Sequence, residues 1–187
     1  FPDFVEREIA GPLALPELRF GARGRAYDSL ARAYWLGGTE RVAGYEIGRD
    51  FERVNNGADV LEADLPGAGL VTDARSLAAF YELWLGRGTM PSGVTLLPEA
   101  LADRYLARHV LGLDRSNRVP LAVARGFLLG TPWPSAYGWC RTSRCFGHAG
   151  AFSTLAFAAP DRRLAAALVT NGNHGRRALI RDLVPVV

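Results

Sequence analysis

The sequence contains no lysine, so all 22 of its basic residues are arginine. A side-chain amine is therefore missing from the list of possible general bases. Mechanisms that depend on a lysine base, such as the chemistry of an S-x-x-K motif, cannot be completed by this chain alone.

Long apolar runs and targeting segments are missing as well. No stretch of eighteen apolar residues predicts a transmembrane helix, and no charged segment followed by an apolar core predicts a signal peptide. The chain also lacks an initiator methionine and opens inside a helical pattern, in which Phe1, Phe4, Val5 and Ile9 recur at helix spacing until Gly11-Pro12. We therefore expect a piece of a longer polypeptide, and the sequence does not indicate its compartment.

Charge is low and dispersed. The net charge is +3, and the densest basic clusters are pairs, Arg162-Arg163 and Arg176-Arg177. Nucleic-acid-binding proteins usually concentrate positive charge on one patch, so the pattern argues against a nucleic-acid partner. The length of 187 residues and the 49% hydrophobic content are typical of one globular domain or a large piece of one.

Only two cysteines are present, Cys140 and Cys145, on either side of Arg-Thr-Ser-Arg. As facing positions of a hairpin they could form a disulfide, which would indicate an oxidising compartment; a free buried pair is the alternative. A zinc site made of Cys140, Cys145, His148 and perhaps His174 is a third possibility, although the spacings match no common zinc module.

Hydrophobic periodicity predicts an α+β domain in which helices precede an antiparallel sheet. Residues 1–125 are expected to be mainly helix and loop, and residues 126–187 to contain antiparallel strands and a C-terminal helix. The expected elements are a turn-rich excursion over 16–66, helices over 72–86 (capped by Thr72) and from Pro98 to about His109, strands over 126–130, 146–159 and 164–171, a turn at Pro160–Arg163, and a helix from Asn173 to Pro185.

The stretch CFGHAGAF, from Cys145 to Phe152, is the strongest candidate for a site. On a strand, His148 and Gly150 share one face, and Gly150 would leave room beside the histidine for a substrate backbone. The amide of Ala151 could then point at a developing oxyanion. The alternative is a closely packed strand with a structural histidine. Tyr27-Asp28-Ser29 is interpreted as loop, although Tyr-x-Ser could form a proton-transfer pair.

Four segments resemble the C-terminal half of the serine β-lactamase and penicillin-binding-protein-like hydrolases, in their class C and esterase branch. They are FVEREIAGPLAL at residues 4–15, LPGAGLVTDARSLAAFYELWLGRGTMPSGVTLL at 65–97, YGW at 137–139, and FGHAGAFSTLAFAAPDRRLAAALVTN at 146–171. The first resembles a helix ending in P-L-G-M, with Ala14-Leu15 in place of Gly-Met. The last resembles a G-H-x-G strand, a D-P turn and a strand ending in asparagine.

The resemblance implies a β-lactamase/transpeptidase-like fold, with an antiparallel sheet flanked by helices, and acyl transfer through an acyl-serine. The serine of S-x-x-K and the assisting Y-x-N/S motif precede the matching segments in the family, so they are not on this chain. Tyr27-Asp28-Ser29 falls in the wrong order to replace the second motif. The nucleophile would come from the N-terminal half of the same polypeptide.

The third family motif, K-T-G or H-x-G, matches His148, Ala149 and Gly150. By that resemblance His148 would polarise the nucleophile–tyrosine network or bind a substrate carboxylate, and Ala151 would give one oxyanion amide. Ala149, Phe152 and Asn171 would contact the substrate. An ester, amide or β-lactam-like small molecule is the implied substrate, no cofactor is implied, and histidine in place of lysine favours an esterase, peptidase or acyl transferase over a strong β-lactamase. The open alternatives are a catalytically inactive binding module and the zinc module.

Overall fold

The structure is a computed structural model, and it describes residues 1–22, 27–37, 40–42, 45–47, 49–115, 119–131, 144–150 and 154–173. In chain order, the N-terminal part contains α1 (Pro2–Val5), the π-helix η1 (Glu6–Ala10), β1 (Arg19–Phe20), the 3-10 helix η2 (Tyr27–Ser29), β2 (Tyr34–Trp35), β3 (Glu40–Val42), β4 (Tyr45–Ile47), α2 (Arg49–Asn55), α3 (Ala58–Leu61) and β5 (Leu70–Val71). The remainder contains α4 (Ala74–Leu85), α5 (Glu99–Leu106), β6 (Val110–Asp114), β7 (Val119–Val123), β8 (Leu128–Leu129), β9 (Phe146–Gly150), β10 (Thr154–Ala159), the 3-10 turn η3 (Pro160–Arg162), β11 (Leu164–Leu168) and β12 (Gly172–Asn173).

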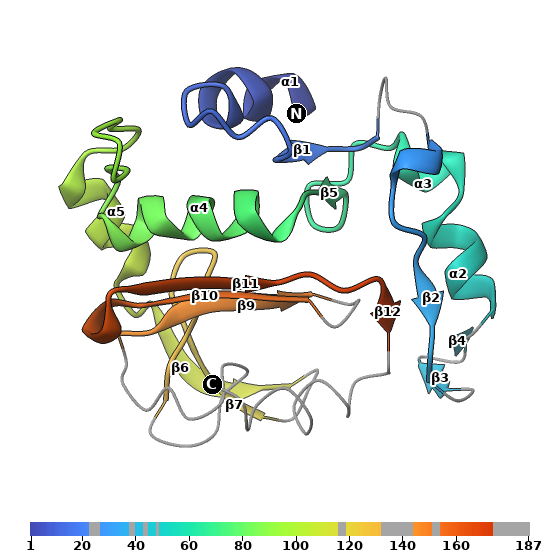
Figure 1. Cartoon of the computed structure of the whole chain (residues 1–187). Coiled ribbons are helices and arrows are strands. Elements are labelled where there is room, and N and C mark those ends of the chain that lie inside the picture. The colour runs from blue at the N-terminus through green and yellow to red at the C-terminus, as the bar shows by residue number, and fades with distance from the viewer. Residues whose placement is uncertain are drawn as a thin grey trace.

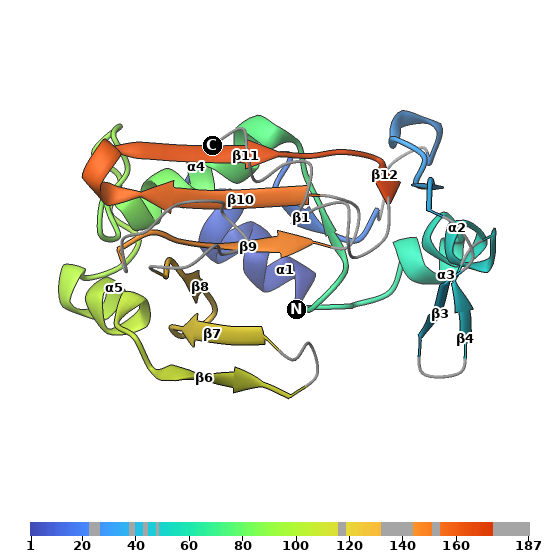
Figure 2. The ribbon, with the colours of Figure 1, turned by 90° about the horizontal axis from the view of Figure 1, so that it is seen from below.

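An antiparallel sheet of six strands organises the molecule, in the order β11-β10-β9-β8-β7-β6. Helix α4 lies along one face of this sheet, and α1 lies on the other side of α4 (Figure 1). The result is an α+β arrangement of layers, as the sequence predicts. Strands β6 and β7 lie at the far side of the sheet, and the β2–α2–α3 region stands beyond one end of it (Figure 2).

Helix α4 forms for the expected reason, since its apolar residues recur at helix spacing. Tyr81 and Trp84 are buried in the largest core cluster, and Leu77, Phe80 and Leu85 pack against it. The cap differs from the prediction: Asp73, rather than Thr72, precedes the helix, and its carboxylate accepts a hydrogen bond from the Ser76 amide at 2.6 Å. Gly86 ends the helix as expected.

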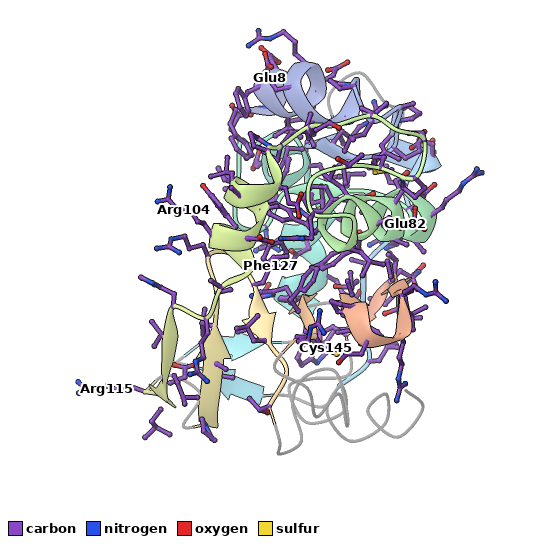
Figure 3. All side chains as sticks on the ribbon, turned by 90° about the vertical axis from the view of Figure 1, so that its left-hand side faces the viewer. Glu8, Glu82, Arg104, Arg115, Phe127 and Cys145 are labelled. Atoms are coloured by element: carbon purple, nitrogen blue, oxygen red, sulfur yellow. The ribbon has the colours of Figure 1, made fainter. Side chains whose placement is uncertain are left out.

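Two apolar clusters use opposite sides of α4. Between α4 and the sheet lie Tyr81 and Trp84 with Phe127 and Phe146, whose rings meet mostly edge to face. Phe127 points from the sheet toward α4 and α5, whereas Arg104 and Arg115 extend outward from the molecule (Figure 3). On the other side of α4, Leu83 packs against the N-terminal residues Ala10, Leu13, Leu15 and Leu18. Because α4 is covered on both sides, it is the central layer of the described structure.

Several predicted elements need correction. The segment 146–159 is two strands, β9 and β10, paired through Gly150↔Thr154 and Phe146↔Ala158. The second helix ends at Leu106, and the His109 amide donates to Val123 O at 2.8 Å, so His109 belongs to the β6–β7 region rather than to a helix end. Strands β6 and β7 precede residue 126, so the sheet begins earlier than expected. The predicted turn between β10 and β11 is confirmed as η3. The expected helix from Asn173 to Pro185 lies, after Asn173, outside the described residues.

Candidate active site

Strand β9 places His148 in the middle of the sheet, between β8 and β10. Gly147 pairs with Leu128 on one side, and His148 pairs with Ala156 on the other. Side chains alternate along a strand, so His148 shares the face of Phe146, which is buried against α4. Unlike Phe146, the His148 side chain is exposed. The strand therefore has a buried start and an exposed end, and the candidate residues occupy the exposed end.

The imidazole of His148 has one ring nitrogen engaged. Its Nδ1 lies 2.7 Å from the carbonyl oxygen of Ala149. A carbonyl oxygen only accepts hydrogen bonds, so this contact requires a proton on Nδ1. In the neutral imidazole Nε2 is then the unprotonated nitrogen, and it can accept a proton or a hydrogen bond from a reacting group.

Ala149 therefore acts through its backbone, and its side chain points to the opposite face of the sheet. There it packs against a cluster formed by Cys145, Leu155, Phe157 and Ala159. A contact between Ala149 and substrate stays a prediction, and the described contacts of Ala149 are to His148 and to this cluster.

The two glycines of the motif have different neighbours. A Cβ atom on Gly147 would lie 2.3 Å from Ala156 O and 2.6 Å from Phe157 Cα, so the backbone of β10 excludes any side chain there. A Cβ on Gly150 would lie 2.2 Å from Thr154 Oγ1. Close packing accounts for Gly147. At Gly150, where the sequence predicts room for a substrate backbone, the Thr154 hydroxyl occupies the place of a side chain.

Thr154 is a polar neighbour of the site that the sequence analysis did not identify. It pairs directly with Gly150 across the β9–β10 hairpin. A single strand over 146–159 would have put the two residues on the same strand, far apart. Two further predicted residues, Ala151 and Phe152, follow Gly150 in the sequence and lie outside the described residues.

Tyr81 links the site to the core. Its side chain is hydrogen-bonded to the backbone of His148, and its ring stacks on Phe146 with centroids 6.4 Å apart. Burial raises the pKa of Tyr81, and the hydrogen bond with His148 acts in the opposite direction with a smaller effect. Tyr81 is thus a neutral phenol under ordinary conditions, and it holds β9 on helix α4.

Asn171, the other predicted substrate contact, uses its side chain elsewhere in the described structure. Its Nδ2 donates to the carbonyl oxygen of Arg32 at 3.0 Å, and its own carbonyl oxygen accepts from the Tyr34 amide at 2.7 Å. It therefore joins the chain after β11 to the segment around β2. A contact between Asn171 and substrate stays a prediction.

Cys145 is bonded in a disulfide and lies in the cluster beneath Ala149. Cys140 lies outside the described residues, so its part in the expected bridge stays a prediction. The sulfur of a disulfide is not a free thiolate, which removes Cys145 from the proposed zinc ligands. Within the described ranges, no three or more His, Cys, Asp or Glu residues form a group that could hold a metal ion.

A family model described as Beta-lactamase matches residues 1–184. The chain belongs to the beta-lactamase family. No curated protein sequence matches it.

Several solved structures share the fold of this beta-lactamase-family chain. A penicillin-binding protein homologue from Caulobacter crescentus superposes with a TM-score of 0.71 at 22% identity, covering 96% of this chain and 50% of its own. A family VIII carboxylesterase gives 0.76 at 18%, covering 99% and 51%. EstA from Arthrobacter nitroguajacolicus Rue61a gives 0.70 at 20%, covering 99% and 53%. These TM-scores show that the chain has the β-lactamase/transpeptidase-like fold that the sequence predicts.

The beta-lactamase-family chain spans about half the length of these solved structures. Its lack of lysine means that it carries no S-x-x-K motif of its own. Among its described residues, none of the helices combines the length and the apolar character needed to cross a membrane.

Proposed function

We propose that this chain supplies one wall of the active site of a serine hydrolase whose nucleophile lies on polypeptide outside it. The family match and the structural relatives support a hydrolase, and the missing lysine supports an external nucleophile. The observation that carries the proposal is the exposed imidazole of His148, with Nδ1 against Ala149 O and Nε2 unprotonated in its neutral form.

In the proposed reaction, the external serine Oγ attacks the carbonyl carbon of an ester or amide. The serine proton passes to a base, and the carbonyl oxygen becomes a transient oxyanion, for which the Ala151 amide is the proposed donor on this chain. The leaving group takes up a proton as the carbon–heteroatom bond breaks, which leaves an acyl-serine. Water then attacks the acyl-serine carbonyl and restores the serine.

His148 Nε2 is proposed to accept a hydrogen bond from the serine and its assisting group, or, when protonated, to hold a substrate carboxylate. A lysine at this position would be an ammonium group that only donates hydrogen bonds, whereas the histidine ring also has a nitrogen that can accept one. A site without a lysine ammonium suits neutral esters better than substrates that need a cation opposite their carboxylate. We therefore propose an esterase, with peptidase or acyl-transferase activity as the neighbouring possibilities.

The partner we propose is the N-terminal half of the same polypeptide. Among the strands that the structure describes, β11 is an end strand of the six-stranded sheet, and Leu164, Leu168 and Val169 on or just after it are each 39% exposed. An unpaired strand edge with exposed apolar side chains is a surface that another strand can complete. These features support a second segment there, and they predict that the chain alone is poorly soluble.

The test is intact-mass spectrometry of native material, under denaturing and non-reducing conditions, after treatment with a fluorophosphonate probe. A probe adduct on a second polypeptide, or on a longer chain at a serine outside residues 1–187, is the expected result. An adduct on a serine of this chain would overturn the proposal that the nucleophile lies outside it. Native material with no adduct would favour a catalytically inactive binding module.

A further inference from the structure

Strand β6 (Val110–Asp114) forms the end of the sheet opposite β11. Among the strands that the structure describes, β6 pairs with β7 alone, and its other edge meets no strand. Helix α4 lies against β10 and β11, whereas β6 lies at the far side of the sheet (Figure 2). An unpaired edge is a place where a protein either meets a partner or has to keep one away.

The apolar side chains of β6 are exposed rather than packed. Val110 is 51% exposed and Leu111 is 54% exposed, and Leu113, at 66%, is the most exposed large apolar side chain among the described residues. Side chains alternate along a strand, so Leu111 and Leu113 lie on one face and Val110 lies on the other. Both faces of β6 are therefore open in the described structure, and three aliphatic side chains this close together indicate an interaction surface.

The sequence around β6 carries positive charge out of proportion to the rest of the chain. Residues 104–125 contain five arginines and one acidic residue, so their net charge is +4, whereas the whole chain has a net charge of +3 and its remaining residues have one of −1. The five arginines stand three to seven positions apart, so they form no basic run in the sequence. They are Arg104, Arg108, Arg115, Arg118 and Arg125.

The structure describes four of these arginines, all of them exposed, and shows where they lie around β6. Arg108 precedes β6 and Arg115 follows it, so each end of the strand has a guanidinium group. Arg125 follows β7, whose end pairs with the start of β6, so Arg108 and Arg125 lie at the same end of the hairpin. Figure 3 shows Arg104, on α5, and Arg115 extending outward on the same side of the molecule.

These arginines are not neutralised by neighbouring carboxylates. Within the described part of the chain, none of the four forms an ion pair, whereas Arg87, which follows α4, pairs with two carboxylates of α5. Arg125 Nη1 instead donates to Arg104 O at 2.8 Å, which holds its guanidinium group beside the end of α5. Like charges gathered at one edge repel one another, so this edge attracts an anionic partner.

The partner of this edge has to match both its aliphatic side chains and its positive charge. A second copy of the chain would match the side chains, but it would bring another net charge of +4 against the same edge. A nucleic acid would match the charge, but it has no apolar interior for Leu111 and Leu113. An anionic lipid surface matches both, because its phosphates attract arginine and its acyl chains accept aliphatic side chains.

We propose that the β6 edge docks on an anionic lipid surface. The β6 edge consists of Val110, Leu111 and Leu113, which insert among the acyl chains, and of Arg108 and Arg115, which bind the phosphates of the headgroups. The docking is peripheral, since β6 is a strand of five residues at the rim of the sheet.

This docking is independent of the proposed hydrolase and of the segment proposed to complete β11. Five strand spacings of about 4.8 Å put β11 and β6 roughly 24 Å apart, so a strand added to β11 does not cover β6. Lipid binding is also measured without an ester substrate, so a failed hydrolase assay leaves its outcome unaffected.

Co-sedimentation of the complete native protein with large unilamellar vesicles tests the docking. One set of vesicles contains phosphatidylcholine alone, and the other contains roughly 30% phosphatidylglycerol in phosphatidylcholine. We expect the partition coefficient at about 50 mM salt to be roughly tenfold or more higher on the anionic vesicles, and this difference to disappear at about 500 mM salt, because salt shortens the Debye length. Equal binding to both sets at low salt, or binding to neither, would overturn the proposal.

Paired variants test the part of the arginines. Arg108→Gln combined with Arg115→Gln should lower the partition coefficient on anionic vesicles roughly tenfold or more, since each arginine near such a surface contributes roughly fivefold. The matched control is Arg53→Gln combined with Arg75→Gln, which removes the same charge from exposed positions on α2 and α4. The control should bind within about twofold of the wild type. Equal losses in the two double variants would overturn the assignment of the lipid contact to β6.

Leu113→Ser tests the insertion of apolar side chains. It should lower the partition coefficient roughly three- to tenfold and leave the urea midpoint unchanged, because the side chain is exposed in the folded protein. Val94→Ser is the control, since Val94 is also exposed but lies between α4 and α5, and it should change neither quantity. If Leu113→Ser binds as the wild type does, the adsorption is electrostatic only and the insertion of β6 is overturned.

Hydrogen exchange locates the contact without any substitution. On anionic vesicles the amides of residues 108–115 should exchange more slowly than in solution, whereas those of α2 should exchange at the same rate. Unchanged exchange over residues 108–115 in the vesicle-bound protein would place the lipid contact elsewhere and overturn the proposal.

Two further measurements distinguish the other partners. A dimer seen in light scattering that Leu113→Ser dissociates, without any vesicle binding, would assign the edge to a second copy of the chain. Binding of a single-stranded oligonucleotide that depends on Arg108 and Arg115, and with which anionic vesicles do not compete, would assign it to nucleic acid. Either result would overturn docking on lipid.

Discussion

Tyr81 on helix α4 is hydrogen-bonded to the backbone of His148 on strand β9. Its ring is buried between Phe146 and Phe127, so the bond joins the best-packed helix to the strand that carries the candidate site. A catalytic side chain needs a backbone that does not drift, and this contact supplies a fixed point directly at His148.

Tyr81→Phe should lower the free energy of unfolding by about 1 kcal/mol near neutral pH, since the ring stays and only the hydroxyl is lost. A second effect appears in alkali. Burial raises the pKa of Tyr81 above the usual 10.0, so above that pH the unfolded chain releases this proton while the folded chain keeps it. The contribution of Tyr81 is therefore complete below pH 10 and is lost as the pH rises further.

Urea unfolding at pH 7.5 and pH 10.5, followed by circular dichroism, checks both effects. The wild type should lose more stability between the two pH values than Tyr81→Phe does. Tyr105→Phe is the control, because it removes a hydroxyl from an exposed tyrosine. An equal loss of unfolding free energy in the wild type and in Tyr81→Phe would contradict a raised pKa of Tyr81 in the folded protein.

The cap of α4 yields a second prediction. Asp73 accepts the Ser76 amide at 2.6 Å, and this hydrogen bond holds the pKa of Asp73 below its usual value. Asp73→Ala should cost about 1 kcal/mol of unfolding free energy. The contribution of Asp73 is present above the ordinary aspartate pKa near 4 and is lost as the pH falls through the lower folded value.

Thr72→Ala separates the two candidate caps. Thr72 donates its hydroxyl to Asp73 O at 3.3 Å and accepts no amide from α4, so its replacement should change the urea midpoint little. A larger loss of stability in Thr72→Ala than in Asp73→Ala would mean that Thr72 caps α4, as the sequence predicts.

Helix α4 could be predicted from the sequence because its evidence is local: five apolar residues at helix spacing, with a polar start and a glycine end. The β9–β10 hairpin could not, since the connecting residues 151–153 are Ala-Phe-Ser, which carry no turn signature, and the whole stretch looks like one apolar strand. Strands β6 and β7 were missed for another reason. Gly112 and Pro120 interrupt them, and the exposed side chains of β6 show no alternation.

Some residues of the candidate site can likewise be predicted from the sequence, and others cannot. His148 and Gly150 stand out in the sequence because a histidine lies among glycines on an apolar strand. The position of Thr154 beside Gly150 and the contacts of Asn171 depend on pairing between segments, and β2 meets β12 across more than 130 residues. Parallel pairing over such a distance leaves no local pattern, so only the structure reveals that Asn171 binds the backbone of Arg32.

The motif glycines allow a third prediction. Gly147→Ala would place a methyl group against Ala156 O and Phe157 Cα, both of which belong to the strand interior. Relief requires β9 and β10 to separate, so we expect a loss of about 3 kcal/mol in unfolding free energy. Gly112→Ala is the control, because no atom lies within 4 Å of its added Cβ, and it should be neutral or slightly stabilising. Similar urea midpoints for the two variants would contradict the packing at Gly147.

His148→Ala addresses the chemistry itself. In the complete enzyme, loss of the imidazole should lower kcat/KM for a simple ester by roughly 10²- to 10⁴-fold, because a positioned proton acceptor or donor is worth that much in acyl transfer. The side chain is exposed and makes one hydrogen bond, to the adjacent carbonyl, so the urea midpoint should hardly move. His109→Ala controls for the removal of an exposed histidine elsewhere.

Comparing the two histidine variants then separates chemistry from packing. If His148 acts through Nε2, kcat/KM should fall in His148→Ala and be retained in His109→Ala, while both variants keep the urea midpoint of the wild type. Unchanged turnover in His148→Ala would mean that the G-H-A-G stretch is only a closely packed strand, as the contacts at Gly147 require, and the proposed catalytic role of this strand would be abandoned.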